Sequence, residues 1–136
     1  MTAHLRIARP VRELERALRL YRKGLGLVEI GRFADHAGFD GVMLGAPAMD
    51  YHLEFTRSRL HAVEPSPSAD DLLVFYIADR GEWKAACARM LAAGFTPVQP
   101  LNPYWQQRGR TFRDDDGYRT VLEQSAWAPA TPGEDR

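Results

Sequence analysis

The stretch Met49-Asp-Tyr-His-Leu-Glu-Phe-Thr56 alternates apolar and polar residues in the manner of a half-buried β-strand. Its apolar side chains are expected on one face of the strand, and His52 and Glu54 on the other. Burying a carboxylate within such a strand costs several kcal/mol unless the charge is paired or coordinates a metal. The function of this chain therefore depends on which group pairs with Glu54.

The composition is that of an ordinary globular protein. The 136 residues are 45% hydrophobic and 26% charged, and 18 basic residues balance 18 acidic ones. A chain of this length forms one compact domain, or two fused halves that share a core. Because the net charge is zero, there is no electrostatic reason to expect nucleic acid or an anionic membrane as a partner.

Cysteine usage and apolar segments indicate a cytoplasmic protein. The single cysteine, Cys87, excludes an internal disulfide framework and fits a reducing compartment. It is expected as a small buried residue on a helix rather than as a reactive thiol. Residues 1–6 lack the basic and apolar segments of a signal peptide. No apolar run approaches the roughly 20 residues that a bilayer requires.

Hydrophobic periodicity and turn residues predict two similar halves. The first half is expected to contain a strand over 5–8, a helix over 11–25, and strands over 27–33, 39–45 and 49–56. The second is expected to contain a central strand over 72–78, a helix over 79–93, an edge strand over 95–99, a loop over 100–109, and strands over 110–113 and 118–123. Each half is thus a βαβββ unit, and such an internal repeat is a strong sign of a duplicated fold.

The predicted fold class is α+β, with two tandem βαβββ units whose mixed sheets curve around one cleft. The units form a single domain over 1–126, divided into a first unit at about 4–57, a polar, proline-containing linker at 58–70 and a second unit at about 71–125. Residues 127–136 are expected to form a flexible tail.

Three stretches resemble the vicinal oxygen chelate superfamily, which includes glyoxalase I, bleomycin-resistance proteins and extradiol dioxygenases. They are the helix over 13–27, similar to the family's first helix and its Phe-Tyr…Leu-Gly ending, the strand Tyr51–Phe55, and the segment Phe112–Tyr118, close to the family's Asp-Pro-Asp-Gly turn. The order and spacing of these motifs make the combined match specific for the fold. It covers roughly residues 4 to 125.

The resemblance implies where metal-dependent members place four ligands, on the first and fourth strands of each unit. By position these fall at Arg6, Glu54, Leu73 and Val121. The same number of residues separates Arg6 from Leu73 and Glu54 from Val121, as a duplicated unit requires. Leucine and valine have no lone pair, and the arginine guanidinium stays protonated. Because a catalytic divalent ion normally needs three protein donors, the inherited metal site is expected to be lost, with no cofactor in its place.

A divalent metal held by Glu54 with His4 or His52 is the alternative. His52 shares a strand face with Glu54, but residues two apart on a strand are about 7 Å apart at the backbone. His4 reaches the ligand position only through a two-residue slip in register. Arg6 is instead expected to pair with Glu54 across neighbouring strands, either to hold the sheet together or to form a cleft floor that grips a polar ligand.

Aromatic and basic residues complete the candidate site. Tyr104 and Trp105 follow a proline in a polar loop, which suits either a wall of the cleft or a cap on the core. Tyr76 lies on an alternating strand, so either it or its neighbour faces the cleft. Arg9 and Arg110 could supply anion contacts or lie on the solvated surface. The predicted ligand-binding set is Arg6, His52, Glu54, Tyr76, Tyr104, Trp105 and Arg110.

The sequence favours a metal-free small-molecule-binding protein of the glyoxalase/bleomycin-resistance type, with a cleft for a small amphipathic or aromatic ligand. The alternative is a lyase, isomerase or dioxygenase-type enzyme in which Glu54 is a metal ligand or a general base. The expected partners are a small-molecule ligand and a second copy of the chain, with no nucleic acid and no membrane.

Overall fold

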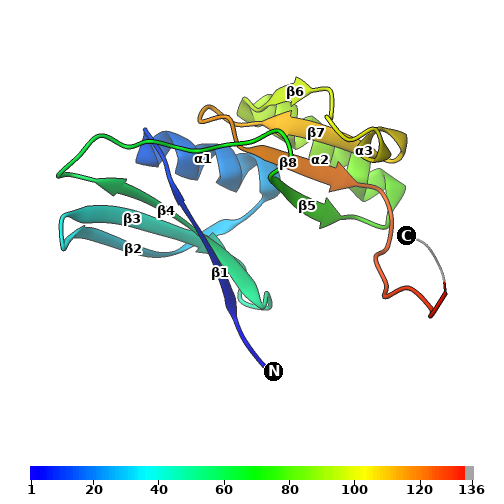
Figure 1. The fold of residues 1–136 in the computed structure, drawn as a ribbon, viewed down its shortest axis with the longest axis horizontal. Coiled ribbons are helices and arrows are strands. Elements are labelled where there is room, and N and C mark those ends of the chain that lie inside the picture. The colour runs from blue at the N-terminus through cyan, green and yellow to red at the C-terminus, as the bar shows by residue number, and fades with distance from the viewer. Residues whose placement is uncertain (134–136) are drawn as a thin grey trace.

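The computed structural model describes residues 1–133 and contains two βαβββ units side by side (Figure 1). The first unit consists of β1 (Leu5–Pro10), α1 (Leu14–Leu25), β2 (Val28–His36), β3 (Phe39–Gly45) and β4 (Tyr51–Ser58). The second consists of β5 (Leu72–Tyr76), α2 (Arg80–Ala93), β6 (Thr96–Val98), α3 (Tyr104–Gln107), β7 (Gly109–Arg113) and β8 (Arg119–Glu123). The predicted α+β class with two tandem units is confirmed.

Each unit forms a four-stranded mixed sheet. The strand orders are β1-β4-β3-β2 and β5-β8-β7-β6. The first and last strands of each unit pair in parallel, and the remaining pairs are antiparallel. The predicted edge position of β6, which contains Pro97, is therefore confirmed.

The prediction that residues 72–78 form a central strand is wrong, because β5 lies at the edge of its sheet. Its apolar character has another cause, which is that both of its faces are partly covered. Leu73 and Phe75 pack against the core cluster, whereas Leu72 and Val74 line a hollow together with Trp105. An apolar run shows that a strand is covered on both faces, but not that it has a neighbour on both sides.

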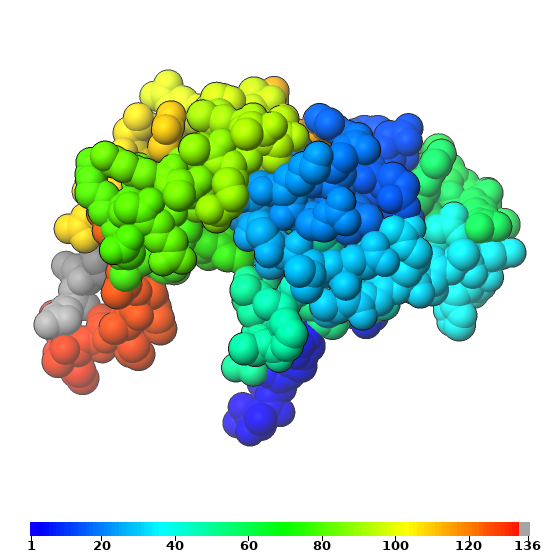
Figure 2. Space-filling model, turned by 180° about the vertical axis from the view of Figure 1, so that it is seen from behind, coloured from blue at the N-terminus to red at the C-terminus, as the bar shows by residue number. Residues whose placement is uncertain are grey.

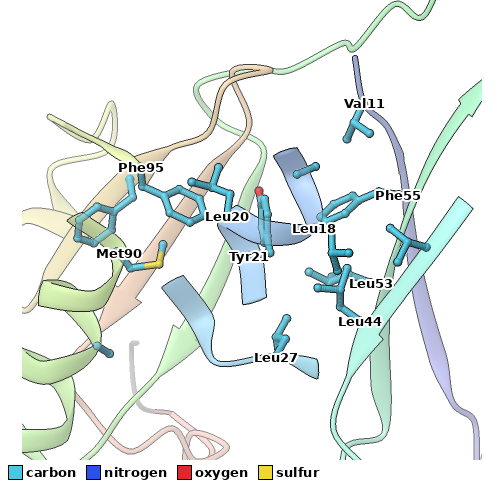
Figure 3. Packing of buried hydrophobic residues seen from close by; sticks show 14 of the residues in the cluster. Val11, Leu18, Leu20, Tyr21, Leu27, Leu44, Leu53, Phe55, Met90 and Phe95 are labelled. Atoms are coloured by element: carbon cyan, nitrogen blue, oxygen red, sulfur yellow. The ribbon is translucent and has the colours of Figure 1, made fainter. Parts of the chain in front are cut away.

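One hydrophobic core joins the two units. Buried residues of α1 meet Met90 and Phe95 of the second unit, as Figure 3 shows. The Tyr21 ring lies edge-on to the Phe95 ring, with 5.2 Å between the ring centroids. Gly24 allows the close approach of the helices, because a Cβ at that position would lie 2.7 Å from Phe95 Cε2 and 2.9 Å from Met90 Sδ.

A buried hydrogen bond also links the units. The Tyr21 hydroxyl donates to Asp114 Oδ2 at 2.6 Å, and Asp114 lies in the predicted turn between β7 and β8. Asp114 Oδ1 accepts the backbone N–H groups of Asp116 and Tyr118. Burial raises the pKa of the Asp114 carboxyl, while these three donors act against the rise. Asp114 thus both holds the turn together and joins it to α1, and only the first of these roles was expected from the sequence.

The first residues of the chain and the segment that follows β8, up to residue 133, project from the same side of the molecule (Figures 1 and 2). The described part of the predicted tail, 127–133, contains no helix or strand, and residues 134–136 lie outside the described residues. Within residues 1–133, no helix has the length and apolar character needed to cross a membrane.

Candidate functional site

Arg6 and Glu54 form an ion pair on the open face of the first sheet, by which we mean the face turned away from α1. The distance from Arg6 Nη1 to Glu54 Oε2 is 3.0 Å, so the predicted pairing is confirmed. The pair forms because β1 and β4 are parallel neighbours, with Arg6 opposite His52 and Ala8 opposite Glu54. Half of the Arg6 side chain is exposed, at 50%, whereas that of Glu54 is 11% exposed. The guanidinium therefore covers the carboxylate and presents its outer edge to solvent.

Two histidines extend the ion pair into a hydrogen-bonded chain. Arg6 Nε donates to His52 Nε2 at 2.9 Å, and His52 Nδ1 lies 2.6 Å from His4 Nε2. Because the guanidinium is always protonated, His52 Nε2 must be the acceptor. A neutral His52 then carries its proton on Nδ1 and donates it to His4 Nε2.

The surroundings of His52 favour its neutral form. Loss of hydration lowers the pKa of the imidazole, and the positive charges of Arg6 and His4 lower it further. The Glu54 carboxylate acts in the opposite direction without cancelling these effects. The lowered pKa of His52 and the hydrogen bond that it accepts from Arg6 both correspond to a neutral imidazole.

The second-unit equivalents of Arg6 and Glu54 carry no polar group. In the second sheet Val121 pairs with Val74, as Glu54 pairs with Ala8 in the first. Counting back two residues along β5 makes Leu72 the equivalent of Arg6. The sequence-based assignment of Leu73 is therefore wrong by one position, and Leu73 packs against the core on the helix-facing side.

The first strand and the fourth strand of the second unit do not follow one common repeat offset. The paired residues Val74 and Val121 are one residue further apart along the chain than their counterparts Ala8 and Glu54. The face on which a strand residue lies changes with every residue, so an error of one position exchanges the two faces.

The residues at the family's metal positions do not fit a metal ion. They offer one carboxylate, that of Glu54, and the Arg6 guanidinium is already bonded to it. Leucine and valine cannot coordinate. Across residues 1–133 no group of three or more His, Cys, Asp or Glu side chains is placed to hold a metal. His4, His52 and Glu54 do lie near one another, but Arg6 stands between His52 and Glu54.

The aromatic candidates gather on the open face of the second sheet, the face turned away from α2. Tyr76, Tyr104 and Trp105 line a hollow of about 360 Å³ together with Arg108 and Trp127. Phe75 faces the core instead, so the predicted alternation along this strand is confirmed. Trp127 was missed because the sequence does not show that the segment after β8 returns to this face. Arg108 was missed because it ends α3, in a segment predicted to be a loop.

Tyr104 and Trp105 belong to α3, a helix of four residues within the segment predicted to be a loop. Trp105 is only 8% exposed, and its backbone N–H donates to the Asn102 carbonyl. This helix covers the open face of the second sheet. Tyr104 and Trp105 therefore form a wall on this open face rather than a cap on the main core.

Arg110 does not lie with the other predicted ligand-binding residues. It pairs with Leu122, whose side chain is part of the core cluster, so Arg110 lies on the helix-facing side. There its charge is close enough to oppose the rise in the pKa of the Cys87 thiol that burial causes. Cys87 itself is 3% exposed, as predicted.

The solvated-surface interpretation of Arg9 is wrong. Its side chain is 7% exposed and its guanidinium carbon lies 4.4 Å from the centroid of the Tyr118 ring. Such a cation–π contact offsets part of the cost of burying the charge. Arg9 faces the core because it alternates with Arg6 on β1.

The structure identifies Glu123, on β8, as a buried acid that the sequence analysis did not select. Glu123 is 4% exposed, and its Oε1 atom has no hydrogen-bond partner among the described residues. Burial raises the pKa of this carboxyl, and the charge of Arg108 acts against the rise. Glu123, like Glu54, is a carboxylate beside apolar residues of a strand, and this pattern could have identified it.

The candidate residues thus form two groups, one on each sheet. The hollow around Tyr76 is lined by residues of the second unit and the segment after it, and by neither Arg6 nor Glu54. A single ligand can contact both groups only if the open face of one sheet lies against the open face of the other.

Comparison with known proteins agrees with this arrangement. The structure has the vicinal oxygen chelate fold, and its structural neighbours include a fosfomycin resistance protein and a glyoxalase I. Residues 5–56 match the YycE-like N-terminal domain, and residues 70–124 match the YycE-like C-terminal domain. The chain belongs to the YycE-like family.

Proteins called YycE are similar to this chain over most of its length. The uncharacterised protein YycE of Bacillus subtilis (strain 168) is 44% identical over 123 residues, which cover 90% of this chain and 88% of that protein. The crystal structure of a YycE protein from Bacillus subtilis superimposes with a TM-score of 0.84 at 40% identity, over 98% of this chain and 95% of that one. That protein has an unknown function and a provisional assignment to the glyoxalase/fosfomycin resistance proteins.

Two more distant structures share the fold. Trypanothione-dependent glyoxalase I of Leishmania major has a TM-score of 0.71 at 19% identity, over 92% of this chain and 88% of that one. TnmS3, an antibiotic binding protein from Streptomyces sp. CB03234, has a TM-score of 0.65 at 22% identity, over 93% of this chain and 98% of that one.

Proposed function

We propose that this chain is a metal-free small-molecule-binding protein of the vicinal oxygen chelate fold. The observation that carries the proposal is the position of the Arg6 guanidinium, which is bonded to both Glu54 and His52. A permanent cation covers the one carboxylate that the family positions provide. A divalent ion at Glu54 would have to displace it.

Arg6 has the properties of a ligand anchor. A guanidinium has five N–H donors, and its contacts with Glu54, His52 and the Met43 sulfur use one donor each. Two donors therefore remain on a half-exposed group. They suit a carboxylate or another oxygen-rich group of a small ligand. TnmS3, an antibiotic binding protein, is an example of this fold in a protein that binds a ligand.

The proposal includes a homodimer, because the two groups of candidate residues lie on different sheets. Apolar residues are exposed on the first unit, with Leu5 at 57%, Val28 at 48% and Ile30 at 49%. A second copy could cover such residues and place the second sheet of one protomer against the Arg6 group of the other. Sedimentation equilibrium at micromolar concentration should give twice the mass of the chain, and a monomer would contradict this part of the proposal.

The metal-free site is tested by thermal unfolding with and without Zn²⁺, Mn²⁺ or Ni²⁺. Because a ligand that binds only the native state raises the unfolding temperature, the wild-type protein should show no shift. Arg6→His removes the guanidinium and adds a donor beside His52 and Glu54, so this variant should gain a shift. Arg19→His adds a histidine to an exposed part of α1 and serves as the matched control.

Ligand binding is tested by calorimetry with 2-naphthoate, an aromatic carboxylate. The wild-type protein should bind it, and Arg6→Gln should weaken binding about tenfold or more by removing the charge. A wild-type metal shift that Glu54→Gln abolishes would replace the proposal by the metal-dependent enzyme. Unchanged binding in Arg6→Gln would remove Arg6 from the ligand site.

A further inference from the structure

Three hollows surround α3 on the second sheet. One, of about 300 Å³, is lined by Leu72, Val74 and Trp105. A second, of about 360 Å³, is lined by Tyr76 and also by Trp105. A third, of about 300 Å³, lies on the other side of α3 beside β7. Trp105 is thus the common wall of the first two hollows.

The first two hollows are parts of one face of the sheet. Leu72, Val74 and Tyr76 alternate along β5, so their side chains share the open face. The first two residues line one hollow and the third lines the next. Without the Trp105 side chain between them, the hollows would form a continuous groove along the strand.

Two polar side chains on the same face each have a buried oxygen that lacks a partner among the described residues. Glu123 lies between Tyr76 of β5 and Gly109 of β7, and Thr111 lies next along β7. Glu123 Oε1 and Thr111 Oγ1 are buried and have no hydrogen-bond partner within residues 1–133. A Cβ on Gly109 would lie 2.8 Å from Glu123 Oε1 and 2.6 Å from the Trp105 carbonyl oxygen, so these atoms lie directly under α3.

Unpartnered buried polar atoms are uncommon in folded proteins and call for an explanation. A carboxylate oxygen held without a donor is costly, and a strand position such as 123 accepts an apolar residue readily. The covering element is also one that can move, because a helix of four residues is not stable by itself. A ligand that displaced the Trp105 ring would occupy the groove and could donate a hydrogen bond to the unpaired Glu123 oxygen.

We propose that the open face of the second sheet is a ligand subsite that Trp105 fills in the unliganded protein, and that Glu123 is its hydrogen-bond acceptor. This inference rests on the proposed small-molecule-binding function and names a second group on the ligand. The ligand part bound here is planar and aromatic, because it takes the place of an indole ring between aromatic walls. It carries an N–H or O–H donor for Glu123.

The donor is neutral rather than cationic. Arg108 lines the hollow beside Tyr76, and its positive charge already acts on the Glu123 carboxyl group. An added ammonium group would be repelled by this guanidinium, whereas a neutral N–H donor would not. The subsite is therefore distinct in chemistry from Arg6, which suits an anionic group.

Indole and 1-methylindole are the matched probes, because they differ in one N–H donor. Calorimetry at pH 8 should show that the wild-type protein binds indole at least tenfold more tightly than 1-methylindole. In Glu123→Leu this preference should fall to about one, with 1-methylindole bound as well as before. Equal affinities in the wild-type protein, or an unchanged preference in Glu123→Leu, would overturn the assignment.

Two further measurements complete the test. The indole N–H resonance of Trp105 in a ¹⁵N-labelled sample should shift when 1-methylindole binds, and an unmoved resonance would exclude displacement of this ring. Arg19→Gln, on an exposed part of α1, is the control and should leave indole binding unchanged. If 2-naphthoate fails to bind while indole shows the Glu123-dependent preference, only the Arg6 part of the proposed function fails. If neither probe binds, the small-molecule-binding function itself is wrong.

Discussion

The ion pair of Arg6 and Glu54 contributes little to stability. Half of the Arg6 side chain is exposed to water, and ion pairs of this kind are worth about 1 kcal/mol or less. Replacing Glu54 by an apolar residue would therefore cost the sheet little, so stability alone does not explain the pair. Its arrangement, with free donors on the exposed edge of the guanidinium, favours a role in binding.

His52 makes the stability of the site dependent on pH. Its folded pKa is lowered from 6.5 mainly by loss of hydration and then by Arg6 and His4. The unfolded chain therefore binds more protons between that folded pKa and about 6.5, and the free energy of unfolding falls as the pH falls through this window. The ¹H–¹⁵N resonances of His52 should titrate with a midpoint below 6.5, and Arg6→Gln should move the midpoint upward.

Chemical denaturation supplies the matching stability measurement. On going from pH 7.5 to pH 5.5, the wild-type protein should lose more stability than His52→Gln, which cannot be protonated. His36→Gln, at the end of β2 and away from this group, is the control and should behave as the wild type. A His52 midpoint at or above the ordinary value would contradict the acceptor role assigned to its Nε2 atom.

At the scale of elements, the two long helices differ in how they begin. The Asp79 side chain of α2 accepts the N–H of Glu82 at 2.8 Å, as its sequence predicted. Glu13 occupies the corresponding position of α1 in an extended conformation but makes no side-chain cap. Both helices end at a glycine in the left-handed conformation, with φ of 72° at Gly26 and 114° at Gly94.

Opposite changes at the two caps should have opposite effects. Asp79→Ala should lower the free energy of unfolding by about 1 kcal/mol, because the first turn of α2 loses its acceptor. Glu13→Ser should raise it by about 0.5 to 1 kcal/mol by supplying the missing acceptor to α1. Urea denaturation measures both, with Asp79→Asn and Glu13→Gln as controls that keep the present state of each cap. A destabilised Glu13→Ser would show that Glu13 has another role at this position.

For the whole molecule, the contact of α1 with α2 makes two repeated units into one cooperative structure. Residues of both units contribute to one buried cluster, and Gly24 of α1 lies against Phe95 and Met90. Neither unit can unfold without exposing apolar side chains of the other. Unfolding of the chain is therefore expected to be a single transition.

Gly24→Ala tests this contact. Alanine favours a helix over glycine by about 1 kcal/mol, but its Cβ would overlap Phe95 and Met90, and overpacking costs about 1 to 3 kcal/mol. The net expectation is a destabilisation of about 1 kcal/mol, measured by urea denaturation. Phe95→Leu combined with Gly24→Ala should cost less than the sum of the single changes. The exposed neighbour Lys23→Ala is the control, and a stabilised Gly24→Ala would show that the helices can move apart freely.

Local patterns predicted most of the fold. The alternation around Glu54 placed its side chain opposite the core-facing residues, and the helical periodicity placed Tyr21 toward the core. Such patterns succeed because the direction of a side chain along a strand or helix depends on neighbours in the sequence. The repeat of βαβββ units followed from the same patterns, and so did the pairing of Arg6 with Glu54 once the first and fourth strands were taken as neighbours.

The sequence by itself therefore determined the eight strands and the two long helices, their repeat and the alternation of faces along each strand. The tertiary structure alone decided that Arg9 is buried under Tyr118, that Leu72 rather than Leu73 matches Arg6, and that α3 covers Glu123. Each of these depends on contacts between segments far apart in the chain, or on the net length of the loops between them. Local periodicity carries no information about such contacts, because they are set by how the finished elements pack.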